Sequence, residues 1–513
     1  MLDSISRRAV LQATTALSLL GLRSAIGQDH LVKPGGSRSN LILFYPDELR
    51  ADALGCYGNP ICKTPNFDLL ARRGVRFANC HVQYPICGAS RCSLLTGWMP
   101  GTHGHRSQSY FLRPDEPNMF RYLKQAGYDV FWFGKNDALA QESFADSVTV
   151  WKDATPRQTP ALLKMMEAIN KAQLVPGVDT MLLPPFGTRT SGSDYQNLKW
   201  AIEILERTEA EEPFCIFIPL VTPHPPYSAP SEFQTMYKPE DLPPLIPSGL
   251  PKKPAFYADL RRYMGLEKAT DRDLRQVRAV YYGKVSYTDW LLGELLEALE
   301  RTGRAKDTAL FVGSDHGDYA GDYGLVEKWP SGMEDCLTHV PLVGSIPGGR
   351  AGVVDQDMVA LFDIMPTLLE LGGTKPTHTN YARSLAPQLH GQPGGWRSAV
   401  FTEGGYNTDE PQAFEPELPG FYAPRTGLEH DRPMDLSRTA AIRTAAFKYV
   451  ERPQGQSELY DLRRDRDLRN NLIDETAHAK TRGRLQRELL DWSINTAGYV
   501  PQDKDPRDIP LQE

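Results

Sequence analysis

The stretch Leu41-Ile42-Leu43-Phe44-Tyr45-Pro46-Asp47-Glu48 begins with five apolar or aromatic side chains and ends with two carboxylates. A short continuous apolar run is typical of a strand that is buried on both faces, as in the parallel sheets of α/β proteins. In open α/β sheets, ligands bind beyond the carboxyl ends of the strands. The stretch therefore predicts a buried strand that carries Asp47 and Glu48 to the ligand-binding edge of a sheet.

The order of helix, strand and polar outlet recurs further along the chain. This alternation predicts an α/β fold with helices on the faces of the sheet and polar groups at four strand ends. The second unit is a helix at 118–126 closed by Gly127, followed by a strand from Tyr128 to Phe133 that leads into Gly134-Lys135. The third is a helix with Leu198, Ala201, Ile202 and Leu205 on one face, followed by a strand from Phe214 to Ile218 that leads into Pro223-His224-Pro225-Pro226-Tyr227. The fourth is a long helix from about Gln276 to Arg301, followed by a strand from Thr308 to Val312 that leads into Gly313-Ser314-Asp315-His316-Gly317.

Length and composition indicate a globular protein of more than one domain. The 513 residues exceed what one hydrophobic core usually supports, and 41% hydrophobic with 24% charged residues excludes a disordered chain. A net charge of -7 gives no basic footprint for nucleic acid, so we expect no nucleic-acid partner. Positive charge for an anionic substrate would have to be local.

The first 28 residues have the pattern of an export signal. Ser6-Arg7-Arg8 leads into an apolar run from Ala13 to Leu22, and small residues at Ala25 and Gly27 offer a cleavage point. The pattern looks like a twin-arginine signal peptide over residues 1–28, although a basic helix start by chance is the alternative. The apolar run is shorter than the about 20 residues that span a bilayer. We therefore expect a periplasmic or secreted protein without a permanent membrane anchor.

A second informative stretch is Cys87-Gly88-Ala89-Ser90-Arg91-Cys92-Ser93-Leu94-Leu95-Thr96-Gly97. Its form, Cys-x-Ala-x-Arg followed by Leu-Thr-Gly, resembles the signature of the type I sulfatases of the alkaline phosphatase superfamily. The resemblance implies that Cys87 is oxidised to formylglycine and that the aldehyde hydrate is the nucleophile. One hydroxyl of a hydrate can attack sulfur and the other can later expel sulfate, which a thiol cannot do. The plain alternative is a buried cysteine ahead of a helix.

The resemblance also implies a metal site. Asp47, Asp315 and His316 match family positions that ligate a divalent cation, usually calcium, together with the modified Cys87. Mn²⁺ and Mg²⁺ are alternatives. Oxygen ligands suit such hard cations. Glu48 stands where many sulfatases carry a second aspartate, so it is either a ligand or a neighbour of the site.

Further charged residues match family positions around the sulfate group. Lys135 and Lys328 match the two lysines that contact sulfate, and Arg91 would add positive charge. His224 matches a histidine near the ester oxygen, where a proton donor helps the leaving group depart. His103, in Pro100-Gly101-Thr102-His103-Gly104, matches a frequent but not universal histidine that we expect to contact substrate.

Three positions depart from the family pattern. Asp137 replaces the histidine that usually helps to deprotonate the aldehyde hydrate, so it either takes that role or binds a cationic or hydroxyl-bearing substrate. Trp98 stands where arginine often follows Thr-Gly. Ala89 replaces the commoner proline, which leaves open whether a formylglycine-generating enzyme or a radical-type maturating enzyme modifies Cys87.

The fold implied by the resemblance is a large mixed, mostly parallel sheet between helices, with a smaller C-terminal α+β domain. We expect a catalytic domain over 38–395 that ends after a helix from Asp357 to Leu371, and a C-terminal domain over 396–513. The latter would hold a short antiparallel sheet and a terminal helix. Its expected segments are Phe401 to Gly405, Ala441 to Thr444, Glu458 to Leu462 and the helix from Thr481 to Trp492.

The sequence thus predicts a sulfuric ester hydrolase. The alternatives are a phosphonate monoester or phosphodiester hydrolase of the same superfamily, and an unmodified, inactive binder of sulfated glycans. The proline-rich insertion from Thr222 to Phe256 is expected to line a substrate cleft. We lean toward a sulfated carbohydrate, on which Tyr227, Trp329, Tyr406 and Phe421 would stack unless they pack in the core.

If Cys87 is oxidised, six of the seven cysteines remain that could form disulfides in the periplasm.

Overall fold

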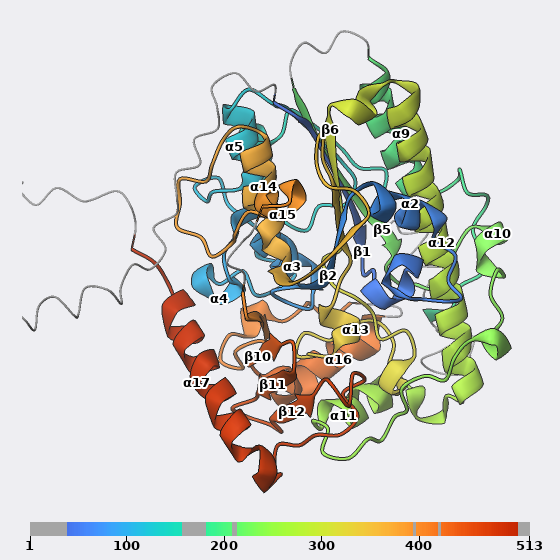
Figure 1. Ribbon diagram of the computed structural model, residues 1–513. Helices are drawn as coiled ribbons and strands as arrows, with labels where there is room; N and C mark the ends of the chain where they lie inside the picture. The colour runs from blue at the N-terminus through green and yellow to red at the C-terminus, as the bar shows by residue number, and fades with distance from the viewer. Residues whose placement is uncertain (1–37, 156–180, 208–212, 393–396, 419–421, 501–513) are drawn as a thin grey trace, which may run out of the picture. The chain divides into compact units, whose positions relative to one another are not determined.

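A computed structural model describes residues 38–155, 181–207, 213–392, 397–418 and 422–500 (Figure 1). The predicted signal peptide over 1–28 and Phe421 lie outside these ranges. None of the helices in the described part of the chain combines the length and apolar character needed to cross a membrane.

The larger of two sheets has eight strands in the order β4-β3-β5-β1-β6-β7-β2-β8. All of its pairings are parallel except those of β7 with β6 and β2, which are antiparallel. This mixed, mostly parallel sheet confirms the predicted fold class. The strands are β1 (Asn40–Asp47), β2 (Val75–His81), β3 (Asp129–Phe133), β4 (Val150–Lys152), β5 (Phe214–Pro223), β6 (Thr308–Gly313), β7 (Leu342–Ser345) and β8 (Val353–Ala360).

The first strand, β1, lies between β5 and β6, and every residue in it is buried. Its side chains alternate between two cores. Ile42 and Phe44 pack with helices α2 (Pro65–Arg73), α9 (Ser193–Glu206) and α12 (Asp271–Arg301). Leu41, Leu43 and Tyr45 pack with α3 (Cys87–Thr96), α5 (Met119–Gln125) and α14 (Ile364–Leu371) on the other face (Figure 1).

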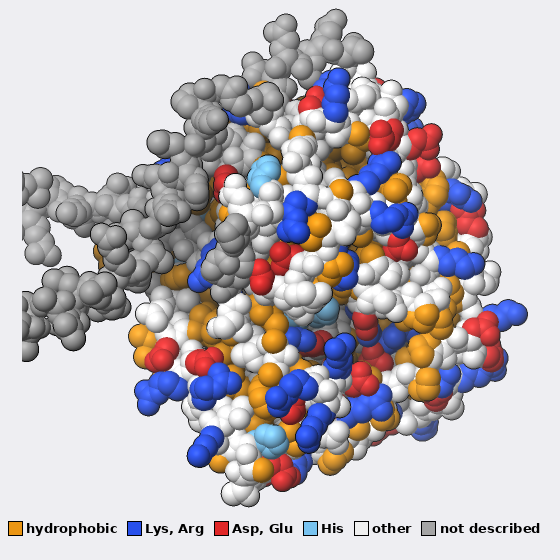
Figure 2. All heavy atoms as spheres, viewed as in Figure 1, with side chains coloured by type: hydrophobic (Ala, Val, Ile, Leu, Met, Phe, Trp, Pro, Cys, Tyr) orange, Lys and Arg blue, Asp and Glu red, His pale blue; other side chains and the backbone are white. Residues whose placement is uncertain are grey.

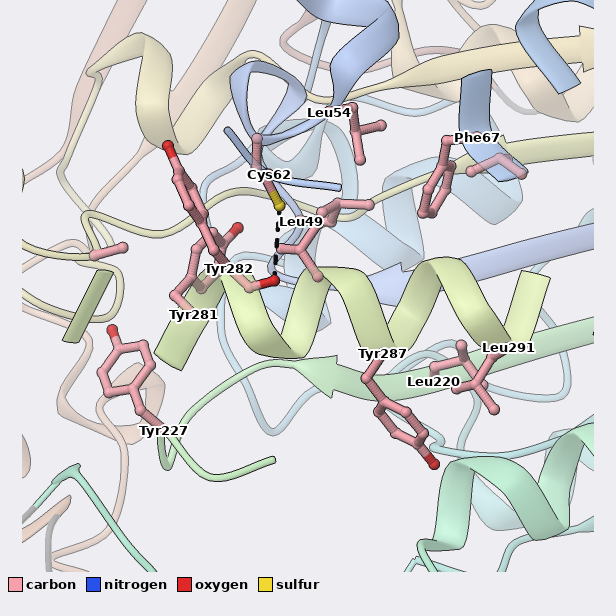
Figure 3. Close-up of a cluster of buried hydrophobic side chains, with 14 of the residues drawn as sticks. Leu49, Leu54, Cys62, Phe67, Leu220, Tyr227, Tyr281, Tyr282, Tyr287 and Leu291 are labelled. Atoms are coloured by element: carbon pink, nitrogen blue, oxygen red, sulfur yellow. Dashed lines mark hydrogen bonds between the residues drawn. The ribbon is translucent and has the colours of Figure 1, made fainter. Parts of the chain in front are cut away.

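The core on the α12 side is rich in tyrosine. Figure 3 shows Tyr281, Tyr282 and Tyr287 of α12 beside Leu49, Leu54, Phe67 and Leu220. The helix begins at Asp271, five residues before the predicted start near Gln276. The Thr270 hydroxyl accepts from the Asp273 amide and the Asp273 carboxylate accepts from the Thr270 amide, a capping box that fixes this start.

A second, four-stranded antiparallel sheet has the order β12-β11-β10-β9. Helix α17 (Ala479–Thr496) packs on it through Leu485 and Leu489, and the Trp492 ring stacks on Phe401 with centroids 4.7 Å apart. This confirms the predicted small antiparallel sheet with a terminal helix, whereas the boundary near residue 395 remains a prediction. The strands are β9 (Ala399–Gly404), β10 (Thr439–Thr444), β11 (Phe447–Glu451) and β12 (Glu458–Asp461), and α16 (Ala423–Asp431) lies between β9 and β10 in the chain.

The expected helix from Asp357 to Leu371 is wrong over its first half. Residues to Ala360 belong to the edge strand β8, which pairs in parallel with β2, and α14 starts only at Ile364. The start of β8 alternates between half-buried and exposed side chains, as an edge strand should. Asp363 then accepts a hydrogen bond from the Ala360 amide at 3.0 Å, which ends the strand and starts a helical turn.

All seven cysteines fall within the described ranges, and each carries a free thiol. The structure therefore forms none of the disulfides that the cysteine count allowed. On the face seen in Figure 2, basic and acidic side chains are interspersed rather than gathered by sign.

Candidate active site

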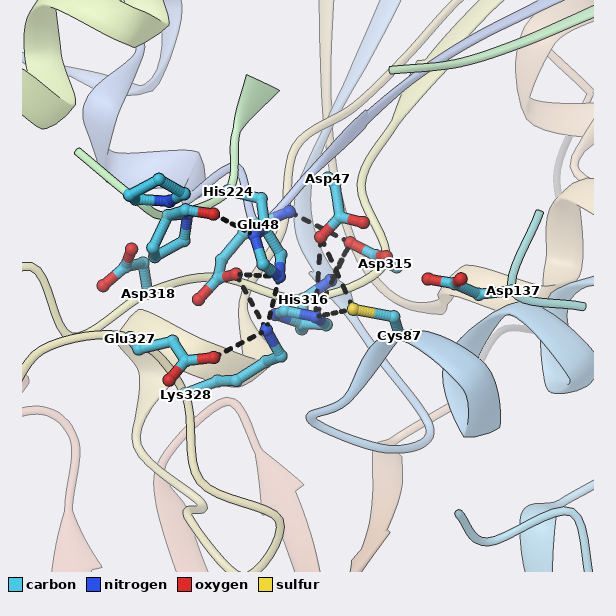
Figure 4. A network of polar contacts seen from close by, with 12 residues as sticks. Asp47, Glu48, Cys87, Asp137, His224, Asp315, His316, Asp318, Glu327 and Lys328 are labelled. Carbon is cyan, nitrogen blue, oxygen red and sulfur yellow. Dashed lines mark hydrogen bonds and ion pairs between the residues drawn. The ribbon is translucent and has the colours of Figure 1, made fainter. Parts of the chain in front are cut away.

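The carboxyl ends of the central strands and the amino end of α3 meet at one place. β1 ends on Asp47 and is followed by Glu48, β6 leads into Asp315 and His316, and α3 begins at Cys87. Figure 4 shows these side chains converging on a small buried volume. The parallel pairing of β1 with β6 places their outlets at the same edge, as the sequence predicted.

Cys87 is almost fully buried, with 1% of its surface exposed. Its Sγ lies 3.1 Å from His316 Nε2, 3.6 Å from Asp47 Oδ1 and 3.8 Å from Lys135 Nζ. Burial, with a further contribution from Asp47, raises the pKa of the Cys87 thiol to about 12. An unmodified thiol here is protonated at neutral pH and is a poor nucleophile.

Arg91 lies one turn along α3 and bridges Asp47 and Asp315. Its Nη2 donates to Asp47 Oδ2 and its Nε to Asp315 Oδ2, both at 2.8 Å, and all three side chains are buried. Removing one member of a buried ion pair typically costs about 3–5 kcal/mol, because the partner charge stays buried. The contacts of Arg91 therefore make it a structural member of the site.

Four ligand atoms of Asp47, Cys87, Asp315 and His316 lie within 4.8 Å of one another. His316 Nδ1 lies 2.9 Å from the Gly317 carbonyl, which can only accept, so Nδ1 carries the proton and the Nε2 lone pair faces the cluster. Glu48 Oε1 is buried and has no hydrogen-bond partner among the described residues, and burial raises the pKa of this carboxyl well above its usual value. Carboxylate oxygens with one neutral imidazole nitrogen are a donor set that fits a divalent cation.

Lys328 joins this cluster to His224. Its Nζ lies 2.9 Å from His224 Nε2, 3.0 Å from Glu48 Oε2 and 3.3 Å from Glu327 Oε1. His224 Nδ1 donates to the Pro225 carbonyl at 2.6 Å, so Nε2 accepts from the lysine. Burial, and then the Lys328 charge, hold the pKa of His224 well below its usual value, and the free imidazole is neutral.

Lys135 and Asp137 form the more open side of the cluster. Lys135 Nζ lies 2.7 Å from Asp47 Oδ2 and 2.8 Å from Asp137 Oδ2, and the two side chains are 21% and 22% exposed. Burial alone would lower the pKa of Lys135, but Asp137 and Asp47 outweigh it and raise this pKa well above its usual value. Gly134 is required before the lysine, because its φ is +136° and a Cβ there would lie 2.1 Å from the Pro219 carbonyl oxygen.

Comparison with known proteins identifies the family of the chain. The sequence profile of the family described as Sulfatase matches residues 39–374, well over half of the chain. The chain belongs to the sulfatase family. This confirms the resemblance and the enzyme class that the sequence predicted.

Similar proteins span several activities of this superfamily. The chain is 28% identical over 510 residues to the multifunctional alkaline phosphatase superfamily protein PehA of Trinickia caryophylli, covering 90% of this chain and 96% of PehA. It is 28% identical over 407 residues to human iduronate 2-sulfatase, covering 68% and 72%. The phosphonate monoester hydrolase of Agrobacterium radiobacter has a similar fold, with a TM-score of 0.73 at 24% identity over 90% of this chain and 96% of that chain.

Of the sulfatase positions predicted from the sequence, the structure brings together all but one. His103 lies on the short helix α4 (Pro100–His103), where its ring stacks on Trp98 with centroids 4.0 Å apart. Its ion-pair neighbour is Glu116, at 4.0 Å. These contacts place His103 beyond the far end of α3 from Cys87.

The described aromatic residues that were expected to stack on a sugar are buried, and Tyr227 lies beside the cluster with its hydroxyl on the Glu327 amide. Tyr227, Trp329 and Tyr406 are at most 1% exposed, so they pack in the core. The insertion lines a cavity of about 330 Å³ between Pro247 and Tyr323, but none of the predicted site residues lines it. The first residues of the insertion, around His224, reach the cluster through Lys328.

Sequence reasoning missed the charged residues that hold the predicted ones. Lys284 of α12 donates to the carbonyls of His224 and Pro226, the latter at 2.8 Å, and so fixes the turn that carries His224. Glu327 contacts Lys328 from the preceding position. The adjacency of Glu327 to Lys328 was a readable signal, whereas nothing local marks Lys284 within a long helix.

Proposed function

We propose that this protein hydrolyses sulfate esters through a formylglycine made from Cys87. The observation that carries the proposal is the Cys87 thiol, buried at the amino end of α3 against Asp47, Lys135 and His316 and protonated at neutral pH. A buried, inert thiol at the centre of a charged cluster suits a precursor better than a nucleophile. When formed, the hydrated aldehyde supplies one hydroxyl for attack on sulfur and a second that later expels sulfate.

We further propose that Asp47, Asp315, His316 and the modified Cys87 hold a divalent cation, with calcium favoured over Mn²⁺ and Mg²⁺. Glu48, whose Oε1 has no hydrogen-bond partner among the residues that the structure describes, is the candidate for a further ligand. Such an ion polarises a sulfate oxygen and favours the ionised form of a neighbouring hydroxyl. Arg91 keeps Asp47 and Asp315 in place for it, since the guanidinium binds the outer oxygen of each.

The remaining residues bind the negatively charged sulfate group or transfer protons to and from the reacting oxygens. Lys135, with its Nζ 3.8 Å from Cys87 Sγ, and Lys328, with its Nζ 2.9 Å from His224 Nε2, would bind the sulfate oxygens. Asp137, next to Lys135, would accept the proton of the attacking hydroxyl in place of the family histidine. His224 Nε2 would donate to the departing ester oxygen once the bound anion raises the pKa of the imidazole.

The proposed substrate is a sulfated carbohydrate, and the proposed setting is the periplasm or the exterior. The similarity to iduronate 2-sulfatase, whose name describes a sulfated sugar acid, supports the carbohydrate. The twin-arginine pattern in residues 1–28 supports export. Cys87 would be modified by a formylglycine-generating or a radical-type maturating enzyme.

Hydrolysis of phosphonate monoesters or phosphodiesters is the second candidate, because PehA is described as multifunctional and covers nearly the same length of chain. We expect kcat/KM for 4-nitrophenyl sulfate to exceed that for 4-nitrophenyl phenylphosphonate by at least about 10-fold, a difference of about 1.4 kcal/mol in transition-state binding. Both esters release the same phenol, so the ratio reports on the anionic centre and its substituents and not on the leaving group. A ratio below one would assign the chain to the second candidate. No turnover of either ester, with an unmodified Cys87 in the peptide mass spectrum, would favour an inactive glycan binder.

Replacement of His224 tests the proton donor. His224→Ala should slow hydrolysis of alkyl sulfates, whose leaving groups need a proton, by about 10² to 10⁴, and should affect nitrophenyl sulfate far less. Lys328→Ala should slow both by a similar factor, because it removes charge from the sulfate site whatever leaves. The measurement is the dependence of kcat/KM on leaving-group pKa in both variants. An unchanged slope in His224→Ala would make His224 a second sulfate contact instead.

A further inference from the structure

A layer of buried charges continues from Lys328 into the C-terminal part of the chain. Glu327 Oε1, which lies 3.3 Å from Lys328 Nζ, also accepts a hydrogen bond from Arg425 Nη1 at 2.8 Å. Arg425 belongs to α16, between the strands β9 and β10 of the second sheet. Its Nη2 contacts Glu415, and the Arg425 and Glu327 side chains are 3% and 1% exposed.

Glu327 has little freedom to move away from this position. Its φ is +62°, its amide donates to the Tyr227 hydroxyl at 2.9 Å, and its carbonyl accepts from the Tyr319 amide at 2.9 Å. The Glu327 carboxylate is therefore a fixed negative charge next to Lys328, and it must be balanced inside the protein.

The charged side chains around Lys328 decide how strongly its ammonium group attracts an anion. Glu48 Oε2 and Glu327 Oε1 both lie within 3.3 Å of the Lys328 ammonium. Arg425 competes with Lys328 for the same Glu327 oxygen and offsets part of the Glu327 charge, while its other Nη contacts Glu415. Without Arg425, Lys328 would be the sole cationic partner of Glu327 in the described part of the chain and would be drawn into a closed ion pair with it.

We infer that Arg425 is a positioning residue of the anion site, which acts through Glu327 to keep the Lys328 ammonium directed at the sulfate group. The inference rests on the proposed function only in that Lys328 binds the anionic centre of the substrate. It assigns to α16, outside the matched range 39–374, a part in the chemistry of the site.

Two substitutions at Arg425 test the inference. Arg425→Met removes the charge and keeps most of the side-chain volume, and we expect it to raise KM for aryl sulfate and the inhibition constant of inorganic sulfate by about 10- to 100-fold, the usual effect of losing a residue that orients a ligand-binding group. Arg425→Lys keeps the charge and should restore much of both constants. Wild-type constants in Arg425→Met would overturn the inference.

Double variants separate this role from a general loss of structure. In Lys328→Met, adding Arg425→Met should change the sulfate inhibition constant by less than about 2-fold, because the residue through which Arg425 acts is gone. In Glu327→Gln, adding Arg425→Met should lower stability, because Glu415 loses its cation, but should change the sulfate inhibition constant by less than about 2-fold, because Glu327 no longer carries the charge through which Arg425 acts. If the increase in the sulfate inhibition constant in either double variant equals the product of the two single-variant increases, the inference is overturned. The Glu327→Gln/Arg425→Met protein also serves if Arg425→Met alone does not fold.

Arg443→Met is the matched control. Arg443 on β10 also links the second sheet to a carboxylate outside it, that of Asp335 on the short helix α13 (Asp335–Thr338), at 2.9 Å, but it contacts none of the described site residues. We expect unchanged KM and sulfate inhibition in this variant, and a loss equal to that of Arg425→Met would overturn the inference. If the protein prefers phosphonate esters, so that the proposed function fails, the same series is measured with 4-nitrophenyl phenylphosphonate as substrate and phenylphosphonate as inhibitor. If it turns over neither, calorimetric binding of inorganic sulfate replaces the inhibition constants.

Discussion

Cys87→Ala is expected to lower kcat/KM for aryl sulfate by roughly 10⁴-fold or more, the scale on which enzymes lose activity with their nucleophile. The thiol is the only reactive side chain at the amino end of α3, and its replacement leaves the ion pairs of Arg91 with Asp47 and Asp315 intact. The cost in stability should be small, about 1 kcal/mol, because only one buried sulfur atom is lost. The measurements are steady-state kinetics, the thermal midpoint and the metal content of the pure variant.

Cys92→Ala provides the matched control for this loss. Cys92 lies five residues further along the same helix, is equally buried, and donates only to the Ala138 carbonyl, at 3.6 Å. Its replacement should lower stability by a similar amount and leave kcat/KM unchanged. The peptide that contains Cys87 should show an aldehyde in the mass spectrum of wild type and of Cys92→Ala. Turnover retained in Cys87→Ala would refute the nucleophile assignment.

The part of the site that sequence could predict is the part that the sheet brings together. Asp47, Lys135, His224 and Asp315 all follow apolar strands, and parallel neighbours in a sheet end at a common edge. Cys87 is found by its own local pattern. These residues need no long-range information beyond the strand assignment, because the pairing of β1 with β5 and β6 supplies the rest.

The part that could not be predicted depends on tertiary packing. Arg425 and Glu327 are 98 positions apart in the sequence. Arg425 lies on the short helix α16, and the packing of this helix against its neighbours sets its place. His103 follows a family pattern, yet α4 turns its ring onto Trp98, which stands where the family often has arginine. The strand β8 carries enough apolar residues for a helix, and only its pairing with β2 decides in favour of a strand.

Asp315→Asn is expected to remove both the metal and the activity. The substitution keeps the shape of the side chain but leaves one fewer negative charge among the donor atoms of Asp47, Cys87 and His316, and it breaks the ion pair with Arg91 Nε. A bound divalent ion contributes several kcal/mol of charge stabilisation in such sites, so kcat/KM should fall by roughly 10³-fold or more. Chelation of the wild type should cause a comparable loss, which calcium reverses in the wild type and not in the variant.

Asp335→Asn distinguishes this effect from the general cost of losing a paired carboxylate. Like Asp315, Asp335 is a carboxylate in ion pairs, with Arg443 at 2.9 Å and Lys448 at 2.8 Å. Unlike Asp315, it contributes to no cluster of metal-ligand atoms among the described residues. The control should lose stability, because Lys448 is buried and would be left without its charge partner, and should keep its calcium content and kcat/KM. Elemental analysis, calcium titration by calorimetry and kinetics are measured on both variants. If Asp315→Asn binds calcium as wild type does, or if exhaustively chelated wild type keeps full activity with no metal detected, then the cluster at the ends of β1 and β6 is not the metal site and the buried carboxylates act on the substrate directly.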